Sequence, residues 1–209
     1  MFSYQQTVFD VCRPCTADLW QQQVSSPQLK ADVERCTELY RQFGKGAAYN
    51  AARNKLPLVT FSATFDPNQG KDGKRALDTW RIQAAVELNG LFMVDVDHLQ
   101  QDFGLTARAL YERSVAASCG LYDEHQSRRI LYFGMTPSGD GARIVATCDA
   151  ACGNLADHQQ WLCSVLGVTC DKSVKNADRA SYMVHADYIY YCNPDIFTYD
   201  NEDYRKEYT

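Results

Sequence analysis

The chain has 209 residues, of which 45% are hydrophobic and 22% are charged, and its formal net charge is −5. This length and composition are typical of one folded domain and exclude a disordered chain. No apolar run approaches the roughly 20 residues that cross a bilayer, and the start lacks a signal peptide, so we expect a cytoplasmic protein with no membrane partner. Because dedicated nucleic-acid-binding domains are more often basic, contact with nucleic acid would depend on a local basic patch.

The first part of the chain, residues 1–55, is predicted to be helical. A helix that begins at Pro27 is indicated by apolar residues at three- and four-residue steps, with Gly44 just past its end. The simplest arrangement packs this helical segment on the back face of the sheet that follows. Residues 56–65 are β-branched and aromatic, which predicts a strand, and residues 66–74 have the Pro, Gly and Asp content of a loop.

The rest of the chain alternates between apolar strands and helices of regular period. Strands are predicted at 90–97, 129–135, 142–148 and 181–191 (the last as one strand or a pair), helices at 105–117 and 155–166, and a tight turn at 136–141. This β-α-β-β-α-β order predicts an α+β fold of the ferredoxin-like or RRM-like split βαβ type. We therefore divide the chain into an N-terminal helical segment (1–55), an α+β domain (56–200) and a polar tail (201–209).

This fold would bring three polar segments together. Its sheet order is 4-1-3-2, with strands that alternate in direction. The end of the first strand, the turn at 136–141 and the segment at 171–179 would then share one edge of the sheet. Polar segments that are distant in sequence and meet at one edge are what an active site requires.

The chain contains nine cysteines, and an odd number without a secretion signal indicates free thiols. Cys12 and Cys15 form a CxxC, which is half of a zinc site, and Cys148 with Cys152 is the only candidate for the other half. That second pair has the wrong spacing and no flanking histidine. The pattern therefore favours small core residues over a structural zinc.

An acidic pair, Asp95 and Asp97, ends the predicted strand at 90–97. Residues at i and i+2 of a strand point to the same face, so the two carboxylates would lie side by side. Such a pair is costly unless a cation lies between them, and hard oxygen ligands suit Mg²⁺ or Mn²⁺. A solvated strand end is the alternative interpretation. His98 follows directly, and it would orient an acid, bind phosphate or cap the next helix.

The turn that follows the second strand of the domain contains Ser138, Gly139 and Gly141, with Arg143 at the start of the return strand. Two glycines free the backbone to expose N–H groups, which cradle phosphate in many proteins. Ser138 would donate a hydrogen bond, and Arg143 would pair with phosphate oxygens bidentately. The alternative is a plain hairpin turn, because Ser-Gly-Asp-Gly is also good turn chemistry.

The third polar segment, residues 170–179, holds two acids and three bases before the last strand. One interpretation is a solvated loop. The other makes Asp171 a third metal-site acid and places Arg179, with Lys172 or Lys175, on a nucleotide. The tyrosines of the last strand, Tyr182 among them, would either stack on bases or belong to the core, and an aromatic strand favours the core.

Taken in order, these motifs resemble a known family. Residues 94–99 (VDVDHL), 136–145 (TPSGDGARIV) and 171–194 (DKSVKNADRASYMVHADYIYYCNP), preceded by FSATF at 61–65, are similar to the primase–polymerase domain of virulence-associated-E-like proteins of mobile elements. That domain belongs to the archaeo-eukaryotic primase superfamily. The similarity covers roughly residues 55–197 in the family's order.

The resemblance implies a metal-dependent nucleotidyltransferase of the DNA primase or polymerase type, acting in replication of a mobile element. Asp95 and Asp97 would bind the metal, with Asp171 as the third acid and Asp178 or Asp187 still open. The residues expected to bind nucleotide are Ser138, Gly139, Gly141, Arg143, Arg179, Lys172 and His98. Arg143 replaces the histidine of the superfamily motif, so a histidine-specific role does not carry over.

The expected partners are nucleoside triphosphates, a single-stranded DNA template and a helicase-like partner domain, which the family often carries downstream. Two other functions fit the same residues. One is a catalytically inactive module that binds nucleic acid or a helicase, which the acidic net charge and the replaced histidine favour. The other is a metal-dependent nuclease or phosphotransferase that uses the same acids.

Overall fold

The computed structural model describes residues 1–66, 81–169, 171 and 176–204. They form a mixed α+β protein with antiparallel sheets, which confirms the predicted α+β fold class. Residues 67–74 of the predicted loop, together with Cys170, Lys172 and Lys175, lie outside the described residues. In the described part of the chain, no helix has both the length and the apolar character needed to cross a bilayer.

The central sheet has the strand order β10-β7-β8-β6. Its strands are β6 (Leu91–Val96), β7 (Ile130–Met135), β8 (Ala142–Thr147) and β10 (Ile189–Cys192). A second sheet has the order β2-β1-β3-β9, from β1 (Ser3–Gln5), β2 (Arg13–Pro14), β3 (Leu58–Thr60) and β9 (Ser181–Tyr182). β4 (Ala63–Phe65) and β5 (Val86–Leu88) form a small two-stranded sheet.

The α-helices of the described chain are α1 (Ala17–Val24), α2 (Pro27–Phe43), α3 (Ala47–Arg53), α4 (Leu99–Phe103), α5 (Ala107–Ala116) and α6 (Leu155–Leu166). Short 3-10 turns occur at Gln83–Ala85, Ala150–Cys152, Ala186–Tyr188 and Pro194–Phe197. Local signals explain the helix ends. Ser26 caps α2 ahead of Pro27, Gly44 ends it at φ 63°, and Asn154 with Asp157 forms a capping box on α6.

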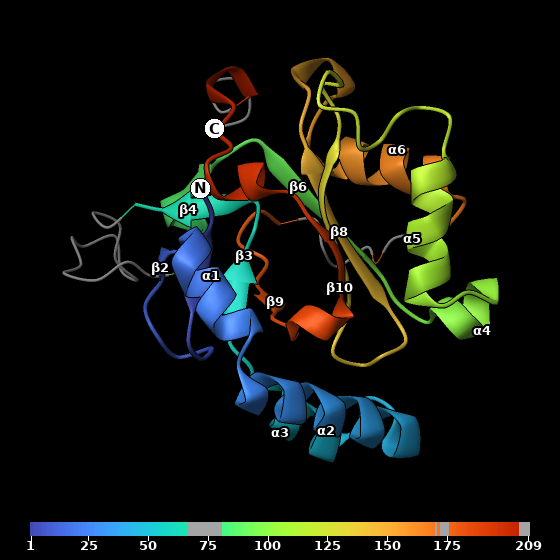
Figure 1. Cartoon of the computed structure of the whole chain (residues 1–209). Helices are drawn as coiled ribbons and strands as arrows, with labels where there is room; N and C mark the ends of the chain where they lie inside the picture. The colour runs from blue at the N-terminus through green and yellow to red at the C-terminus, as the bar shows by residue number, and fades with distance from the viewer. Residues whose placement is uncertain (67–80, 170, 172–175, 205–209) are drawn as a thin grey trace.

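The central sheet lies between two cores, as Figure 1 shows, with α5 and α6 on one side and the N-terminal elements on the other. Side chains of β6 alternate between these cores: Phe92 and Val94 pack with α5 and α6, while Leu91 and Met93 pack with α1, α2 and α3. The alternation places Asp95 on the face that the N-terminal segment covers. The N-terminal segment thus packs on the sheet face opposite α5 and α6, the face on which Asp95 lies.

The strand order differs from the predicted 4-1-3-2. β10, the fourth strand of the domain, pairs with β7, the second, and β6 lies at the sheet edge among the described strands. The backbone N–H of Asp171 donates to the Asp95 carbonyl at 2.9 Å, and Gln159 Nε2 donates to the Met93 carbonyl at 2.9 Å. These groups occupy the edge of β6 where the fourth strand was expected.

Two further expectations are corrected. Residues 1–55 are not helical throughout, since β1 and β2 precede α1 and join the second sheet. The single strand expected at 56–65 is two short strands, β3 and β4, which belong to different sheets. The pair of strands that the 181–191 pattern allowed is present as β9 and β10, also in different sheets.

The described cysteines are free, and Cys12 and Cys15 are buried in separate apolar clusters. Burial raises the pKa of both thiols to about 12, so they are neutral at physiological pH. In this structure the two cysteines are core residues of two different apolar clusters.

Candidate functional site

One cavity in the described structure is lined by Asp95, Asp97 and Asp171 together with residues of the glycine turn, β8, α3 and the 179–182 segment. Asp95 is in β6 and Asp97 follows the strand directly. The acids therefore emerge where the apolar strand ends, next to the turn between β7 and β8. Segments that are far apart in the sequence supply the walls of one concave, polar site.

The Asp95 carboxylate is held by Arg143 from the neighbouring strand. The two residues face each other in the β6–β8 register. Arg143 Nε donates to Asp95 Oδ1 at 2.8 Å and Nη2 donates to Oδ2 at 3.0 Å, while Nη1 donates to the Tyr182 carbonyl at 2.8 Å. The side chains are only 8% and 14% exposed. Burial alone would lower the pKa of Arg143, but the Asp95 carboxylate raises it above its ordinary value.

The sequence suggested that Arg143 would pair with phosphate. In the structure its guanidinium makes a bidentate pair with Asp95 instead, which is the strongest geometry for an arginine and a carboxylate. Arg143 thus fixes the orientation of an acid at the site. It still lines the cavity.

Asp97 also has a cationic partner, Lys45, whose Nζ lies 2.6 Å from Asp97 Oδ2. Lys45 comes from the break between α2 and α3, where Gly44 has a left-handed φ of 63°. Desolvation opposes the charge on Lys45, but the Asp97 carboxylate raises its pKa overall. Lys45 was not among the residues predicted from the sequence, where its signal is a lysine between two glycines at the end of a long helix.

The glycine turn is tightly packed. Gly139 has φ 77°, and a Cβ there would lie 2.7 Å from Thr37 Cγ2 on α2. A Cβ on Gly141 would lie 2.9 Å from the Val96 carbonyl oxygen. These contacts explain the glycines by close packing alone, and of the turn's three predicted residues only Ser138 lines the cavity in the described structure.

Ser138 is buried inside the turn, with Oγ 3.0 Å from Thr136 Oγ1 and accepting from the Asp140 N–H at 3.3 Å. Gly139 N–H donates to the Thr136 carbonyl at 3.0 Å. The turn therefore uses these groups internally, and Ser138 also lines the cavity.

His98 lies just outside this cavity. It is the N-cap of α4 with φ 54°, a left-handed conformation that is uncommon for a residue with a Cβ. Its Nδ1 lies 3.1 Å from Tyr40 Oη and 3.8 Å from Asp140 Oδ2. His98 lines an adjoining open cavity, which shares Lys45, Asp97 and Asp171 with the first.

The structure distinguishes among the three candidate third acids. Asp171 and Arg179 line the cavity with Asp95, whereas Asp178 is not a lining residue. Asp187 lies elsewhere, paired with Lys30 at 2.6 Å, and the hydrogen bond from Lys30 lowers the pKa of Asp187. Of the bases in this segment, Arg179 is at the cavity, and Lys172 lies outside the described residues.

The helix α3 supplies Tyr49 and Arg53 to the cavity wall, and the sequence analysis named neither. The Arg53 guanidinium carbon lies 5.3 Å from the Tyr49 ring centroid and 5.0 Å from that of Tyr182. Burial raises the pKa of Tyr49 to about 12, so it is a neutral phenol. Tyr182 therefore belongs to the site, whereas Tyr190 and Tyr191 pack in the core beside α5 and α6.

The donor set suits a hard cation, because three carboxylates face one cavity. In this arrangement, however, Arg143 and Lys45 already bind oxygens of Asp95 and Asp97. The described residues also show no ready-made cluster of three or more metal-ligating side chains. A divalent cation would fit if it shared Asp95 with Arg143 and displaced Lys45 from Asp97.

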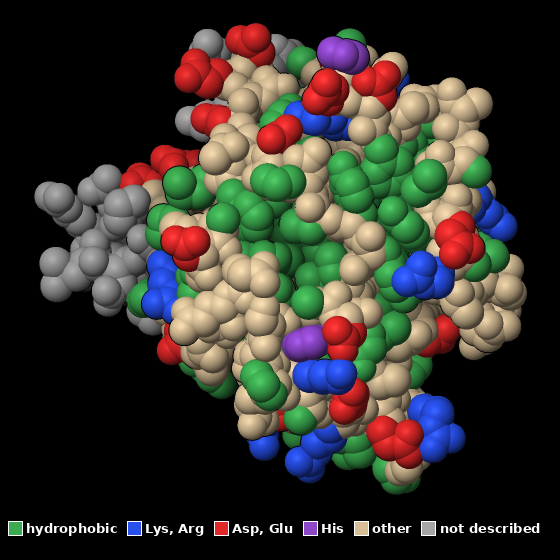
Figure 2. All heavy atoms as spheres, viewed as in Figure 1, with side chains coloured by type: hydrophobic (Ala, Val, Ile, Leu, Met, Phe, Trp, Pro, Cys, Tyr) green, Lys and Arg blue, Asp and Glu red, His purple; other side chains and the backbone are tan. Residues whose placement is uncertain are grey.

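Comparison with protein-family models, curated proteins and solved structures finds no match to this chain. On the face in Figure 2, Lys and Arg side chains are scattered and do not gather into one basic patch. The site itself contains both signs of charge: three acids and the four bases Lys45, Arg53, Arg143 and Arg179.

Proposed function

We propose that this chain is a metal-dependent nucleotidyltransferase of the DNA primase–polymerase type, related to the archaeo-eukaryotic primases and acting in replication of a mobile element. The observation that carries the proposal is one cavity lined by three acids, a serine and several bases, drawn from segments spread over the chain. Carboxylates that bind Mg²⁺ or Mn²⁺ beside bases that bind phosphate are what nucleotide transfer requires.

The fold is compatible with this proposal at the level of element order. β6, α5, β7, β8, α6 and β10 follow one another as in a split βαβ domain, with both helices on one face of the sheet. We regard the pairing of β10 with β7 as a variant of the ferredoxin-like or RRM-like arrangement. The acids lie on the side of the sheet opposite α5 and α6, which the N-terminal segment covers.

In the proposed reaction a 3′-hydroxyl oxygen attacks the α-phosphate of a nucleoside triphosphate, the bond from the α-phosphate to pyrophosphate breaks, and the hydroxyl proton is released to solvent. A divalent cation would activate the hydroxyl and stabilise the charge that develops on the phosphates. Asp95, Asp97 and Asp171 would hold it, and Arg143 would keep Asp95 in place through the bidentate pair. Ser138 and Arg179 would bind phosphate oxygens. A single-stranded DNA template and a helicase-like partner domain complete the proposal.

The test is incorporation of labelled nucleotide on primed and unprimed single-stranded DNA with Mg²⁺ or Mn²⁺. Asp95→Asn with Asp97→Asn should abolish product. The matched control is Asp187→Asn with Asp195→Asn, which also removes two charges from acids that pair with bases, but away from the cavity. Equal loss in both double variants, or product that survives the first, would contradict the assigned site. The unprimed reaction distinguishes a primase from an enzyme that only extends.

One observation favours a second candidate, an inactive module that binds nucleic acid or a helicase. Both oxygens of Asp95 accept from Arg143, and Asp97 pairs with Lys45, so the acids are neutralised within the protein. A folded protein that binds DNA without metal and incorporates no nucleotide under either metal would support this candidate. Time-dependent cutting of DNA without added nucleotide would instead indicate a nuclease.

A further inference from the structure

The bases at the cavity differ in whether an acid already neutralises them. Arg143 is paired with Asp95 and Lys45 with Asp97. Arg53 makes no ion pair with any described acid, and its Nε is a buried polar atom to which the described residues offer no hydrogen-bond partner. A buried donor without a partner is costly, so such a group in a cavity wall indicates a ligand.

The surroundings of Arg53 fix its position without neutralising it. Tyr49 and Arg53 are four residues apart on α3 and therefore lie on one face of the helix. The guanidinium lies over the rings of Tyr49 and Tyr182, at 5.3 Å and 5.0 Å. Stacking on rings restricts the guanidinium and retains its positive charge. Tyr182 is itself anchored, because its hydroxyl donates to Asn54 Oδ1 at 2.7 Å.

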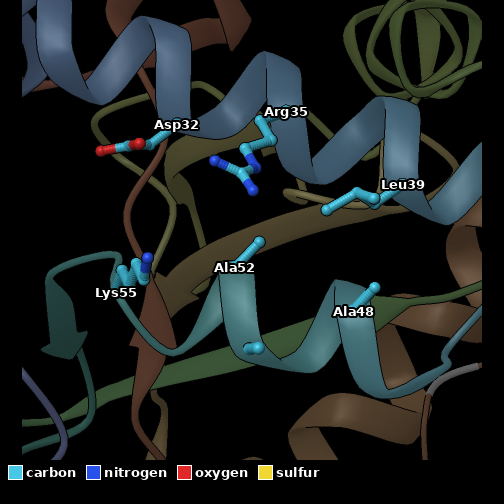
Figure 3. A pocket seen from close by; sticks show the side chains of 7 residues that line it. Asp32, Arg35, Leu39, Ala48, Ala52 and Lys55 are labelled. Carbon is cyan, nitrogen blue, oxygen red and sulfur yellow. The ribbon is translucent and has the colours of Figure 1, made fainter.

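A neighbouring face of α3 carries alanines and points toward α2. Figure 3 shows Ala48 and Ala52 pointing toward α2, where Arg35 and Leu39 line a separate pocket. Arg35 is exposed and does not line the cavity that holds the acids. The helix thus directs Ala48 and Ala52 toward a pocket that it shares with α2, and it presents Tyr49 and Arg53 to the site.

Resting on the proposed function, we infer that Arg53 is a phosphate-binding residue of the site, which recognises the triphosphate of the incoming nucleotide. Its guanidinium, which makes no ion pair with a described acid, lines the same cavity as Asp95, Asp97 and Ser138. Phosphates bound near those carboxylates meet a planar fork of donors, which matches phosphate oxygens. The N-terminal segment is then part of the binding machinery and not only a support for the sheet.

The experiment measures binding of a nucleoside triphosphate and of the matching nucleoside to the full chain, by calorimetry with Mg²⁺. Arg53→Gln should weaken triphosphate binding roughly 10- to 100-fold, the loss expected for one charge-assisted contact, and leave nucleoside binding unchanged. The triphosphate affinity of Arg53→Lys should lie between those of the wild type and Arg53→Gln. Arg35→Gln is the control, because it makes the same chemical change on α2 outside the cavity.

Each outcome bears on the inference. Equal triphosphate affinity in wild type and Arg53→Gln would overturn it, as would an equal loss for triphosphate and nucleoside, or a wild type that does not bind triphosphate. Thermal unfolding of each variant separates a folding defect from a binding defect, and if Arg53→Gln does not fold, Arg53→Lys decides the question. Triphosphate binding that depends on Arg53, without any nucleotide incorporation, would keep the inference and reject the transferase proposal.

Discussion

The pair formed by Arg143 and Asp95 gives the sharpest prediction about stability. Replacing Arg143 by Met leaves a carboxylate that is only 14% exposed without its bidentate partner. Breaking a buried pair from one side costs about 3–5 kcal/mol. For a domain of this size each kcal/mol corresponds to about 2–4 °C, so the melting temperature should fall by about 6–20 °C. Chemical denaturation monitored by circular dichroism measures the free energy directly.

The mechanism behind that cost is tested by a double variant and a control. Arg143→Met with Asp95→Leu removes both charges, and it should regain most of the lost stability because no buried charge is left unpaired. Lys30→Met breaks the exposed pair with Asp187 and should leave the unfolding midpoint unchanged. A loss below about 1 kcal/mol for Arg143→Met, or a double variant no more stable than the single one, would refute the reasoning.

Three other predictions concern the fold. Gly139→Ala should destabilise the protein more than Gly104→Ala. Both positions have positive φ, but only a Cβ at residue 139 would have a side-chain atom at 2.7 Å. Urea denaturation of the two variants compares their free energies of unfolding. Asn154→Ala should cost about 1 kcal/mol by removing the cap of α6, measured in the same way, and an unchanged midpoint would exclude the capping role. A thiol reagent near neutral pH should label exposed Cys119 well before buried Cys15, whose pKa is raised to about 12, as peptide mapping would show.

Segments with strong local signals were predictable from the sequence. The helix at 155–166 has a capping box before it and a left-handed glycine after it, and the structure gives it the predicted bounds. The hairpin of β7 and β8 follows from two apolar runs around a turn rich in glycine. β1 and β2 are three and two residues long, which is too short for an alternation pattern to identify them.

Strand order was not predictable in the same way, because it depends on long-range pairing. The sequence does not specify whether the last strand joins the first or the second strand of the domain. In the structure β9 first pairs with β3 in the other sheet, and the chain then reaches β7 through β10. The β-α-β-β-α-β order does not contain this pairing of β9 with β3, which lies outside the central sheet.

At the site, motifs identified the residues that belong to the central sheet, and the structure brings Asp95, Asp97 and Asp171 to one cavity. The opposite wall was missed because α3 is only seven residues long and carries no recognisable motif. Lys45 and Arg53 become meaningful only when the fold places them opposite the acids. Sequence patterns therefore indicated one wall of the site, and tertiary packing determined the other.

The two basic side chains that pair with the acids, Arg143 and Lys45, differ in burial, and this difference bears on the proposed chemistry. Arg143 and Asp95 are almost fully buried, so their pair is part of the folded structure. Lys45 is 48% exposed and Asp97 is 31% exposed, and solvent screens such a pair until it contributes little. A divalent cation would therefore exchange with Lys45 at small cost while Asp95 stays oriented by Arg143. Under the proposed function, Lys45 would hold Asp97 in place without a cation, and its ammonium group would become available to phosphate oxygens if a cation took its place.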